Sequence, residues 1–242
     1  MPDRERSSGT LALRRLLRGF EHFHDNFFEG DDRPYERLVS EGQSPRVLVI
    51  ACSDSRSDPA LLTEAQPGDL FVIRNVAALV PAYEKPRGVP KGTSAAVEFG
   101  VRALEVDHII VLGHSHCGGI RFLAERRGGS ADFEFLPDWV AMAGEMVAEM
   151  ENLASEAGEA ERLRWLEKAA IGLSLRNLQS FPWIAERVQG GKLALHGWHF
   201  DLQHGQIQAL DGASGRFRAV AAGELPAPAC GCCEGLMGLV ER

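Results

Sequence analysis

The sequence predicts a single α/β domain with a mostly parallel β-sheet flanked by helices, and an N-terminal helical arm. Three continuous apolar runs, at residues 47–51, 70–73 and 108–112, are typical of strands buried on both faces of a sheet. A helical pattern over residues 92–104 separates the last two runs. Strands that alternate with helices favour parallel pairing with right-handed crossovers. A length of 242 residues with 45% hydrophobic content is enough for one large core.

The N-terminal segment predicts an amphipathic helix over residues 10–28. Its apolar side chains recur at the i, i+3, i+4 and i+7 spacing, and Thr10 is a suitable N-cap. The main apolar positions are Leu13, Leu16, Leu17, Phe20 and Phe27. This apolar face is larger than a peripheral helix usually needs.

The second half of the chain predicts two helices and a closing hairpin. The helices are expected over residues 137–151 and 159–180, after an exposed loop at 126–132 that is rich in glycine and charge. Two alternating stretches, 192–200 and 206–210, predict the hairpin. We therefore expect an arm over residues 1–30, an α/β domain over 31–224 and a cysteine-containing tail over 225–242.

Composition and charge argue against several classes of protein. A net charge of −8 argues against general nucleic-acid binding, which needs a basic face. No apolar run approaches the length of a membrane span, and Arg14 and Arg15 interrupt the apolar residues that a secretory signal would need. The five cysteines form two single sites and one tail cluster rather than a disulfide framework. A reducing cytoplasm fits this distribution best.

Two short cysteine motifs each follow one of the apolar runs. Cys52 opens Cys-Ser-Asp-Ser-Arg after the first run, and His114 and Cys117 belong to His-Ser-His-Cys-Gly-Gly after the third. Because ligand sites gather at the carboxyl ends of strands in open α/β sheets, we expect these side chains to converge. Two thiols and one imidazole are good zinc ligands, and three protein ligands leave a fourth tetrahedral position for water. The pattern therefore predicts a catalytic zinc rather than a structural one.

Each of these residues also has a simpler interpretation. Free cysteines are often core residues, but Cys52 and Cys117 lie beside polar residues at strand ends rather than inside the apolar runs. Asp54 also suits a helix N-cap, with Arg56 as a surface partner of little energetic weight. As a functional pair, Arg56 would hold Asp54 ionised and fixed in direction. Asp54 would then accept a hydrogen bond only from a metal-bound species that still carries a proton.

Taken together, the two motifs resemble those of the β-class carbonic anhydrases, in the plant-like branch of that family. The resemblance extends over residues 11–210 and includes the segments 43–45, 67–75, 92–99 and 174–178. It implies reversible hydration of carbon dioxide to bicarbonate and a proton by a zinc-bound hydroxide, with one Zn²⁺ per chain. It also implies that Asp54 and Arg56 are catalytic and that Asp54 can become a fourth zinc ligand in a closed state.

The resemblance further implies a substrate pocket and an assembly. It assigns Gln43 as a hydrogen-bond donor to the substrate, and Phe71 and Phe99 as walls of an apolar carbon dioxide pocket near a subunit boundary. Gly118, which also reads as part of a simple turn, frees a backbone N–H to approach a substrate oxygen. The amphipathic arm is then expected to pack on a neighbouring subunit. The expected assembly is a homodimer or a higher even-numbered homo-oligomer in the cytoplasm, with no nucleic-acid or membrane partner.

Two other functions use the same residues. Hydrolysis of carbon disulfide or carbonyl sulfide, known in relatives of the family, needs the same zinc ligands and differs in access to the site. A non-enzymatic zinc-bearing bicarbonate sensor is the other, and the Asp54–Arg56 pair argues against it. The tail departs from the family pattern and suits a soft metal, redox exchange or simply a solvated end. Its cysteines are Cys230, Cys232 and Cys233.

The resemblance also bears on regulation. In the bacterial branch that inhibits itself, a tryptophan three residues before the first zinc cysteine and a valine after the arginine help to hold a non-catalytic bicarbonate. Here these positions are Val49 and Ser57. We therefore expect no bicarbonate lock, and expect Asp54 to stay paired with Arg56 near neutral pH.

Overall fold

The computed structural model of the protein describes residues 2–29, 32–125, 133–153, 158–221, 223–224 and 227–229. It divides the chain into two units, Met1–Ser44 and Pro45–Arg242. The expected loop at 126–132 and the tail cysteines Cys230, Cys232 and Cys233 lie outside the described residues. The segment boundaries expected after residues 30 and 224 stay predictions.

The first unit consists of helices α1 (Pro2–Phe28) and α2 (Pro34–Glu41). The expected arm helix is present and begins earlier than Thr10. An aromatic cluster joins the two helices, because the Tyr35 ring lies 4.8 Å from the Phe28 ring and 5.6 Å from the Phe23 ring between centroids. The apolar positions of the preceding turns are 59–68% exposed, and they are Leu13, Leu16, Leu17 and Phe20.

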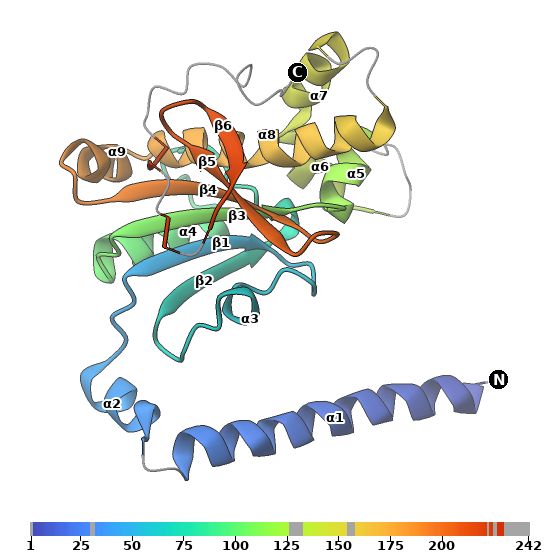
Figure 1. Cartoon of the computed structure of the whole chain (residues 1–242), viewed down its shortest axis with the longest axis vertical. Helices are drawn as coiled ribbons and strands as arrows, with labels where there is room; N and C mark the ends of the chain where they lie inside the picture. The colour runs from blue at the N-terminus through green and yellow to red at the C-terminus, as the bar shows by residue number, and fades with distance from the viewer. Residues whose placement is uncertain are drawn as a thin grey trace. The chain divides into compact units, whose positions relative to one another are not determined.

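The second unit is built on a six-stranded sheet with the strand order β2-β1-β3-β4-β5-β6 (Figure 1). The first four strands are parallel: β1 (Val47–Cys52), β2 (Leu70–Asn75), β3 (His108–His114) and β4 (Ala194–Asp201). The last two pair antiparallel: β5 (Gln206–Asp211) and β6 (Arg216–Ala219). The mostly parallel α/β fold predicted from the sequence is confirmed, and β6 is an additional strand that the pattern of alternation did not reveal.

The main core lies on one face of this sheet, under helices from three parts of the chain (Figure 1). These helices are α4 (Gly92–Glu98) with its π-helical continuation η2 (Phe99–Ala103), α8 (Glu159–Gln179) and α9 (Pro182–Gln189). Helix α8 lies close to β3 and β4 because Gly113 and Gly197 leave room for Ile171. A Cβ atom added at either glycine would lie 2.8 Å from an Ile171 side-chain carbon.

Two elements differ from the sequence expectation. The helix expected over residues 137–151 is divided into α6 (Leu136–Ala141) and α7 (Gly144–Leu153). The break falls just before Gly144, where helix propensity is poor, and the Ala143 N–H closes a turn onto the Val140 carbonyl. A short helix, α3 (Pro59–Thr63), follows the first cysteine motif and packs Leu62 against the other face of the sheet. No helix within the described ranges has the length and apolar character to cross a membrane.

Candidate metal centre

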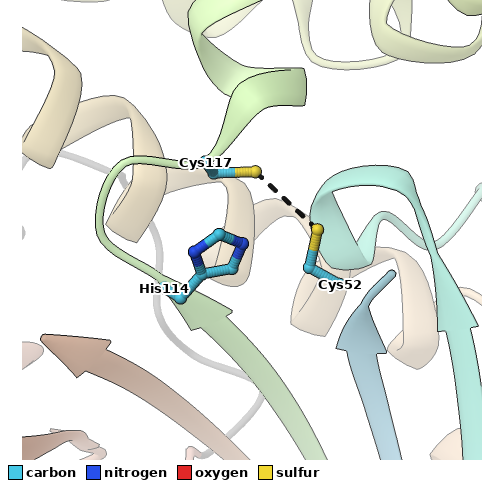
Figure 2. Close-up of side chains that lie close together, drawn as sticks. All are labelled: Cys52, His114 and Cys117. Atoms are coloured by element: carbon cyan, nitrogen blue, oxygen red, sulfur yellow. Dashed lines mark hydrogen bonds between the residues drawn. The ribbon is translucent and has the colours of Figure 1, made fainter. Parts of the chain in front are cut away.

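The predicted metal ligands lie at the carboxyl ends of two neighbouring strands (Figure 2). Cys52 ends β1, His114 ends β3, and Cys117 directly precedes α5 (Gly118–Ala124). All three side chains are buried, and their ligand atoms lie within 4.8 Å of one another. The parallel pairing of β1 with β3 produces this convergence, because it brings both strand ends to the same edge of the sheet.

The arrangement of the donor atoms fits a tetrahedral zinc ion. The Cys52 and Cys117 sulfurs are 3.9 Å apart, and zinc–sulfur bonds of about 2.3 Å give a tetrahedral edge of about 3.8 Å. The His114 Nδ1–H donates to the Ser115 carbonyl oxygen at 2.9 Å, which leaves a lone pair on Nε2. That Nε2 atom is buried without a hydrogen-bond partner among the described residues. A metal ion would satisfy the hydrogen-bonding capacity of this nitrogen.

The pKa values of the two thiols also favour a metal ion at this site. A hydrogen bond from the Cys117 thiol lowers the pKa of Cys52, the adjacent His114 imidazole lowers it further, and the backbone N–H groups of Asp54 and Ala77 add to the effect. The hydrogen bond to Cys52 raises the pKa of Cys117, and burial adds to the effect. Two thiolates at this separation repel each other, so the fully deprotonated pair needs a cation between its sulfurs.

The segment after β2 is shaped around the Cys52 sulfur. In the short helix η1 (Val76–Ala78), Ala77 and Ala78 have φ values of 64° and 53°. Left-handed backbone is unfavourable for alanine and persists only where the surroundings enforce it. Ser174 on α8 enforces it by donating from Oγ to the Ala78 carbonyl oxygen at 3.1 Å. The enforced conformation keeps the Ala77 N–H beside the Cys52 sulfur.

The second glycine of the Gly-Gly pair after Cys117 is required for close packing. A Cβ atom at Gly119 would lie 2.6 Å from Val76 Cγ1 and 3.2 Å from Ala77 Cβ, so only glycine lets α5 approach η1 this closely. At Gly118, predicted to bind substrate, an added Cβ atom would meet nothing within 4 Å. The role of the Gly118 N–H therefore stays a prediction.

Asp54 and Arg56 form a two-pronged ion pair beside the three ligands. The Arg56 Nε–H donates to Asp54 Oδ1 at 2.9 Å and the Nη2–H to Oδ2 at 2.7 Å. These hydrogen bonds hold the pKa of Asp54 well below its usual range and raise that of Arg56. Asp54 Oδ2 lies 3.9 Å from His114 Nε2. The fixed carboxylate thus borders the place where the ligand atoms converge.

Arg74 is a residue of this site that the sequence analysis did not single out. Its Nε–H donates to the Cys52 carbonyl oxygen at 3.1 Å, and its Nη2–H donates to the Asp54 carbonyl oxygen at 2.7 Å. Its Nη1–H reaches Asp58 at 2.6 Å, and Asp58 is the N-cap of α3. Asp58 therefore fills the capping role considered for Asp54. The available signal was an arginine at the end of an otherwise apolar strand.

Gly118 adjoins Cys117, but the other predicted substrate residues are not brought to the three ligands within the second unit. Phe71 and Phe99 are in contact, with ring centroids 5.8 Å apart, and Phe99 is 48% exposed. Phe71 pairs with Leu48, four residues before Cys52 and so about 13 Å away along the strand. Gln43 belongs to the first unit. The substrate-binding roles of all three residues stay predictions.

Comparisons with known proteins agree with a metal-dependent α/β enzyme. The sequence model described as "Carbonic anhydrase" matches residues 47–207. A carbonic anhydrase of Pseudomonas aeruginosa is 39% identical over 214 residues, which cover 86% of this chain and 92% of the relative. The chloroplastic β-carbonic anhydrase 5 of Arabidopsis thaliana is 39% identical over 171 residues, covering 71% of this chain and 56% of the relative.

Solved structures give the same result. The β-carbonic anhydrase CcaA matches with a TM-score of 0.82 and 34% identity, over 91% of this chain and 96% of its own. A structure described as one of two tetrameric β-carbonic anhydrases from Sordaria macrospora matches with a TM-score of 0.68 and 27% identity, over 90% of this chain and 100% of its own. The fold and the site define an enzyme of the zinc-lyase type. The chain belongs to the carbonic anhydrase family, in its β class.

Proposed function

We propose that this protein catalyses the reversible hydration of carbon dioxide to bicarbonate and a proton, with one zinc ion held by Cys52, His114 and Cys117. The observation that carries the proposal is His114 Nε2, which is buried close to two thiols and has no hydrogen-bond partner among the described residues. Membership of the carbonic anhydrase family supports the reaction. The Asp54–Arg56 pair beside the ligands supports a catalytic rather than a structural metal.

The chemistry divides between the metal and the pair beside it. Cys52, His114 and Cys117 would hold the zinc ion, which when bound would lower the pKa of a water molecule towards neutrality and so supply a nucleophile at working pH. Ionised Asp54 can only accept hydrogen bonds. It therefore engages the attacking oxygen only while that oxygen carries a proton, and it directs a lone pair towards the carbon of the substrate. Arg56 prevents the carboxylate from rotating, because it holds both oxygens.

The apolar part of the carbon dioxide pocket belongs, in this proposal, to a subunit boundary. The Phe99 ring contacts the Phe71 ring and still leaves much of its surface exposed. Helix α1 carries a continuous exposed apolar face. Both surfaces gain by burial in an assembly. The proposed active unit is a homodimer or an even-numbered multiple of it, in which Gln43 donates its amide N–H to a substrate oxygen beside these rings.

Metal analysis combined with stopped-flow carbon dioxide hydration tests this function. The wild-type protein is expected to contain one zinc per chain and to be active, and Cys52→Ser is expected to lose both. Cys230→Ser, in the tail, is the matched control and should keep both. Full zinc occupancy in Cys52→Ser would refute the ligand assignment. Parallel assays with carbonyl sulfide and carbon disulfide separate hydration from hydrolysis, and any turnover argues against a non-enzymatic sensor.

A further inference from the structure

A buried glutamate–histidine pair lies beside Cys117, and the proposed function gives it no role. Glu167 on α8 and His199 on β4 are only 4% and 2% exposed. Glu167 Oε2 lies 3.3 Å from His199 Nε2, and Glu167 Oε1 accepts the Cys117 backbone N–H at 3.2 Å. Glutamate is almost never buried to this extent without a partner, because desolvating its charge is costly.

Packing alone does not account for a glutamate here. The neighbouring residues on the same buried face of α8 are apolar or small: Ala170, Ile171 and Ser174. An apolar side chain of similar volume would fill this position without the cost of burying a charge. Within the described part of the chain, the Glu167 carboxylate makes polar contacts with His199 and with the Cys117 N–H. What the carboxylate adds is therefore a fixed, charged acceptor for one backbone amide.

That amide belongs to a tight turn in which hydrogen bonds also hold Ser115 and His116. Ser115 is tied to β4 by its N–H, which donates to the Phe200 carbonyl oxygen at 2.9 Å. His116 is exposed and left-handed, with φ of 58°. Cys117 is the N-cap residue of α5 and has no side-chain capping bond. Within the described residues, the Cys117 carbonyl oxygen accepts the Arg121 N–H of α5 at 3.0 Å, and the N–H groups of Gly119 and Ile120 face the sulfur. The bond to Glu167 is the restraint on the Cys117 N–H.

We infer that Glu167, clamped by His199, is a positioning residue that fixes the Cys117 sulfur for zinc through the Cys117 N–H. A charged acceptor forms a shorter and stronger hydrogen bond than a neutral one. The His199 Nε2–H donates to the carboxylate, and its Nδ1 is buried without a partner among the described residues. Within the described residues, Glu167 is therefore the hydrogen-bond partner of the His199 side chain. This inference rests on the proposed function, since it requires the zinc ion.

The test measures metal binding rather than activity. Zinc affinity by chelator competition and the absorption spectrum of the cobalt-substituted protein are compared for wild type, Glu167→Ala, Glu167→Gln and His199→Phe. Glu167→Ala is expected to weaken zinc binding about 10- to 100-fold and to alter the cobalt spectrum. Glu167→Gln keeps a neutral acceptor and should lie between Glu167→Ala and wild type, as should His199→Phe. Glu161→Gln, on the exposed part of α8, is the matched control and should match wild type.

The outcomes separate the two proposals. A wild-type protein that binds no zinc refutes the proposed function, and this inference with it. A zinc-binding wild type with unchanged affinity and spectrum in Glu167→Ala refutes this inference alone, even if the free energy of unfolding falls. If Glu167→Ala does not fold, selective ¹⁵N-cysteine labelling of the wild type decides. The Cys117 amide should show a downfield proton shift and slow hydrogen exchange, and rapid exchange there would overturn the inference.

Discussion

At the residue scale, the direction of the Asp54 side chain depends on two guanidinium groups. Arg56 holds the carboxylate, and Arg74 holds the backbone carbonyl of the same residue. Because Arg74 also holds the Cys52 carbonyl, a single side chain fixes the backbone of a proposed ligand and of the proposed acceptor. Substitutions at Asp54 and Arg74 should therefore have different effects, one on chemistry and the other on the local fold.

Asp54→Asn is expected to keep its zinc and lose most of its turnover. The asparagine amide can donate where the proposed chemistry requires an acceptor, so hydration should fall by about 10²-fold or more. Metal analysis and stopped-flow rates on the same sample check this. Asp107→Asn, which removes a carboxylate paired with Arg46 away from the site, is the control. Near-normal rates in zinc-loaded Asp54→Asn would contradict the role of Asp54.

Arg74→Lys is expected to destabilise the fold although it keeps the charge. Lysine cannot reach both carbonyls and Asp58 at once, so buried acceptors lose their partners. The free energy of unfolding, measured with denaturant, should fall by about 2–3 kcal/mol. Arg102→Lys, in an exposed pair with Glu98, should change it by less than about 0.5 kcal/mol. Equal stability of the two variants would show that the three bonds of Arg74 matter little.

The residues that the sequence did and did not reveal differ in a simple physical way. Cys52, His114 and Cys117 were predictable because their chemistry is rare and their spacing is local to two strand ends. Arg74 and Glu167 were not, because their partners are backbone groups distant in sequence. No composition or periodicity signals a side chain that binds a distant amide or carbonyl. For Glu167, the available signal was an ionisable residue on an otherwise apolar helix face.

At the element scale, the contact between α5 and η1 sets the position of one wall of the site. Gly119→Ala would drive a methyl group into Val76 and Ala77. We expect a loss of about 1–3 kcal/mol in unfolding free energy and weaker zinc binding, because η1 carries the N–H beside Cys52. Gly118→Ala is the matched control, since open space surrounds its Cβ position.

A second substitution gives the contact a direct test. Val76→Ala removes the carbon atom that lies closest to the added methyl group, so it should restore part of the stability and the zinc affinity of Gly119→Ala. A double-mutant cycle on the unfolding free energies measures this coupling. Strict additivity of the two substitutions would mean that the contact does not position η1.

The elements themselves followed the sequence where periodicity was strong. Strands β1 and β3 and helix α8 were predicted as such, because continuous apolar runs and a long helical repeat leave little ambiguity. The strand expected at residues 70–73 is present as β2, but it lies at the edge of the sheet and buries only Ile73, so the expectation that it is buried on both faces was wrong. The helix expected over residues 137–151 is interrupted just before Gly144. This break depends on local turn geometry rather than on periodicity. Strand β6 has four residues, too few for an alternating pattern to be evident.

At the scale of the whole molecule, the apolar face of α1 calls for an assembly. Leu16→Glu combined with Leu17→Glu should convert the proposed dimer into monomers and lower hydration, because charges would have to be buried in the interface. Analytical ultracentrifugation at assay concentration checks this. Arg15→Glu with Arg18→Glu places the same number of carboxylates on the other side of α1 and should leave the assembly intact. A fully active wild-type monomer would refute the assembly.

The dependence of the hydration activity on pH and on bicarbonate should be simple. The Arg56 guanidinium depresses the pKa of Asp54. A carboxyl of this kind ionises below its ordinary value of about 3.9 and contributes to stability above that pH, losing the contribution only as the pH falls further. Asp54 therefore adds no step to the profile between pH 6 and 9 in a titration series. Hydration should rise smoothly with pH, without cooperative inhibition by bicarbonate. Steep cooperative inhibition, or Asp54 bound to zinc near neutral pH, would contradict this.

The hydrogen bonds that orient the metal-binding atoms also bear on whether folding or metal binding comes first. The Ser115 carbonyl orients the His114 ring, and backbone N–H groups surround the Cys52 sulfur. The chain makes these bonds to itself, so it can fold first and take up its ion afterwards, unlike a zinc finger, which folds only with its metal. A finished protein of this kind exchanges ions with its surroundings and ranks them by intrinsic affinity. The supply of divalent ions then decides, as much as the chain does, which ion it carries.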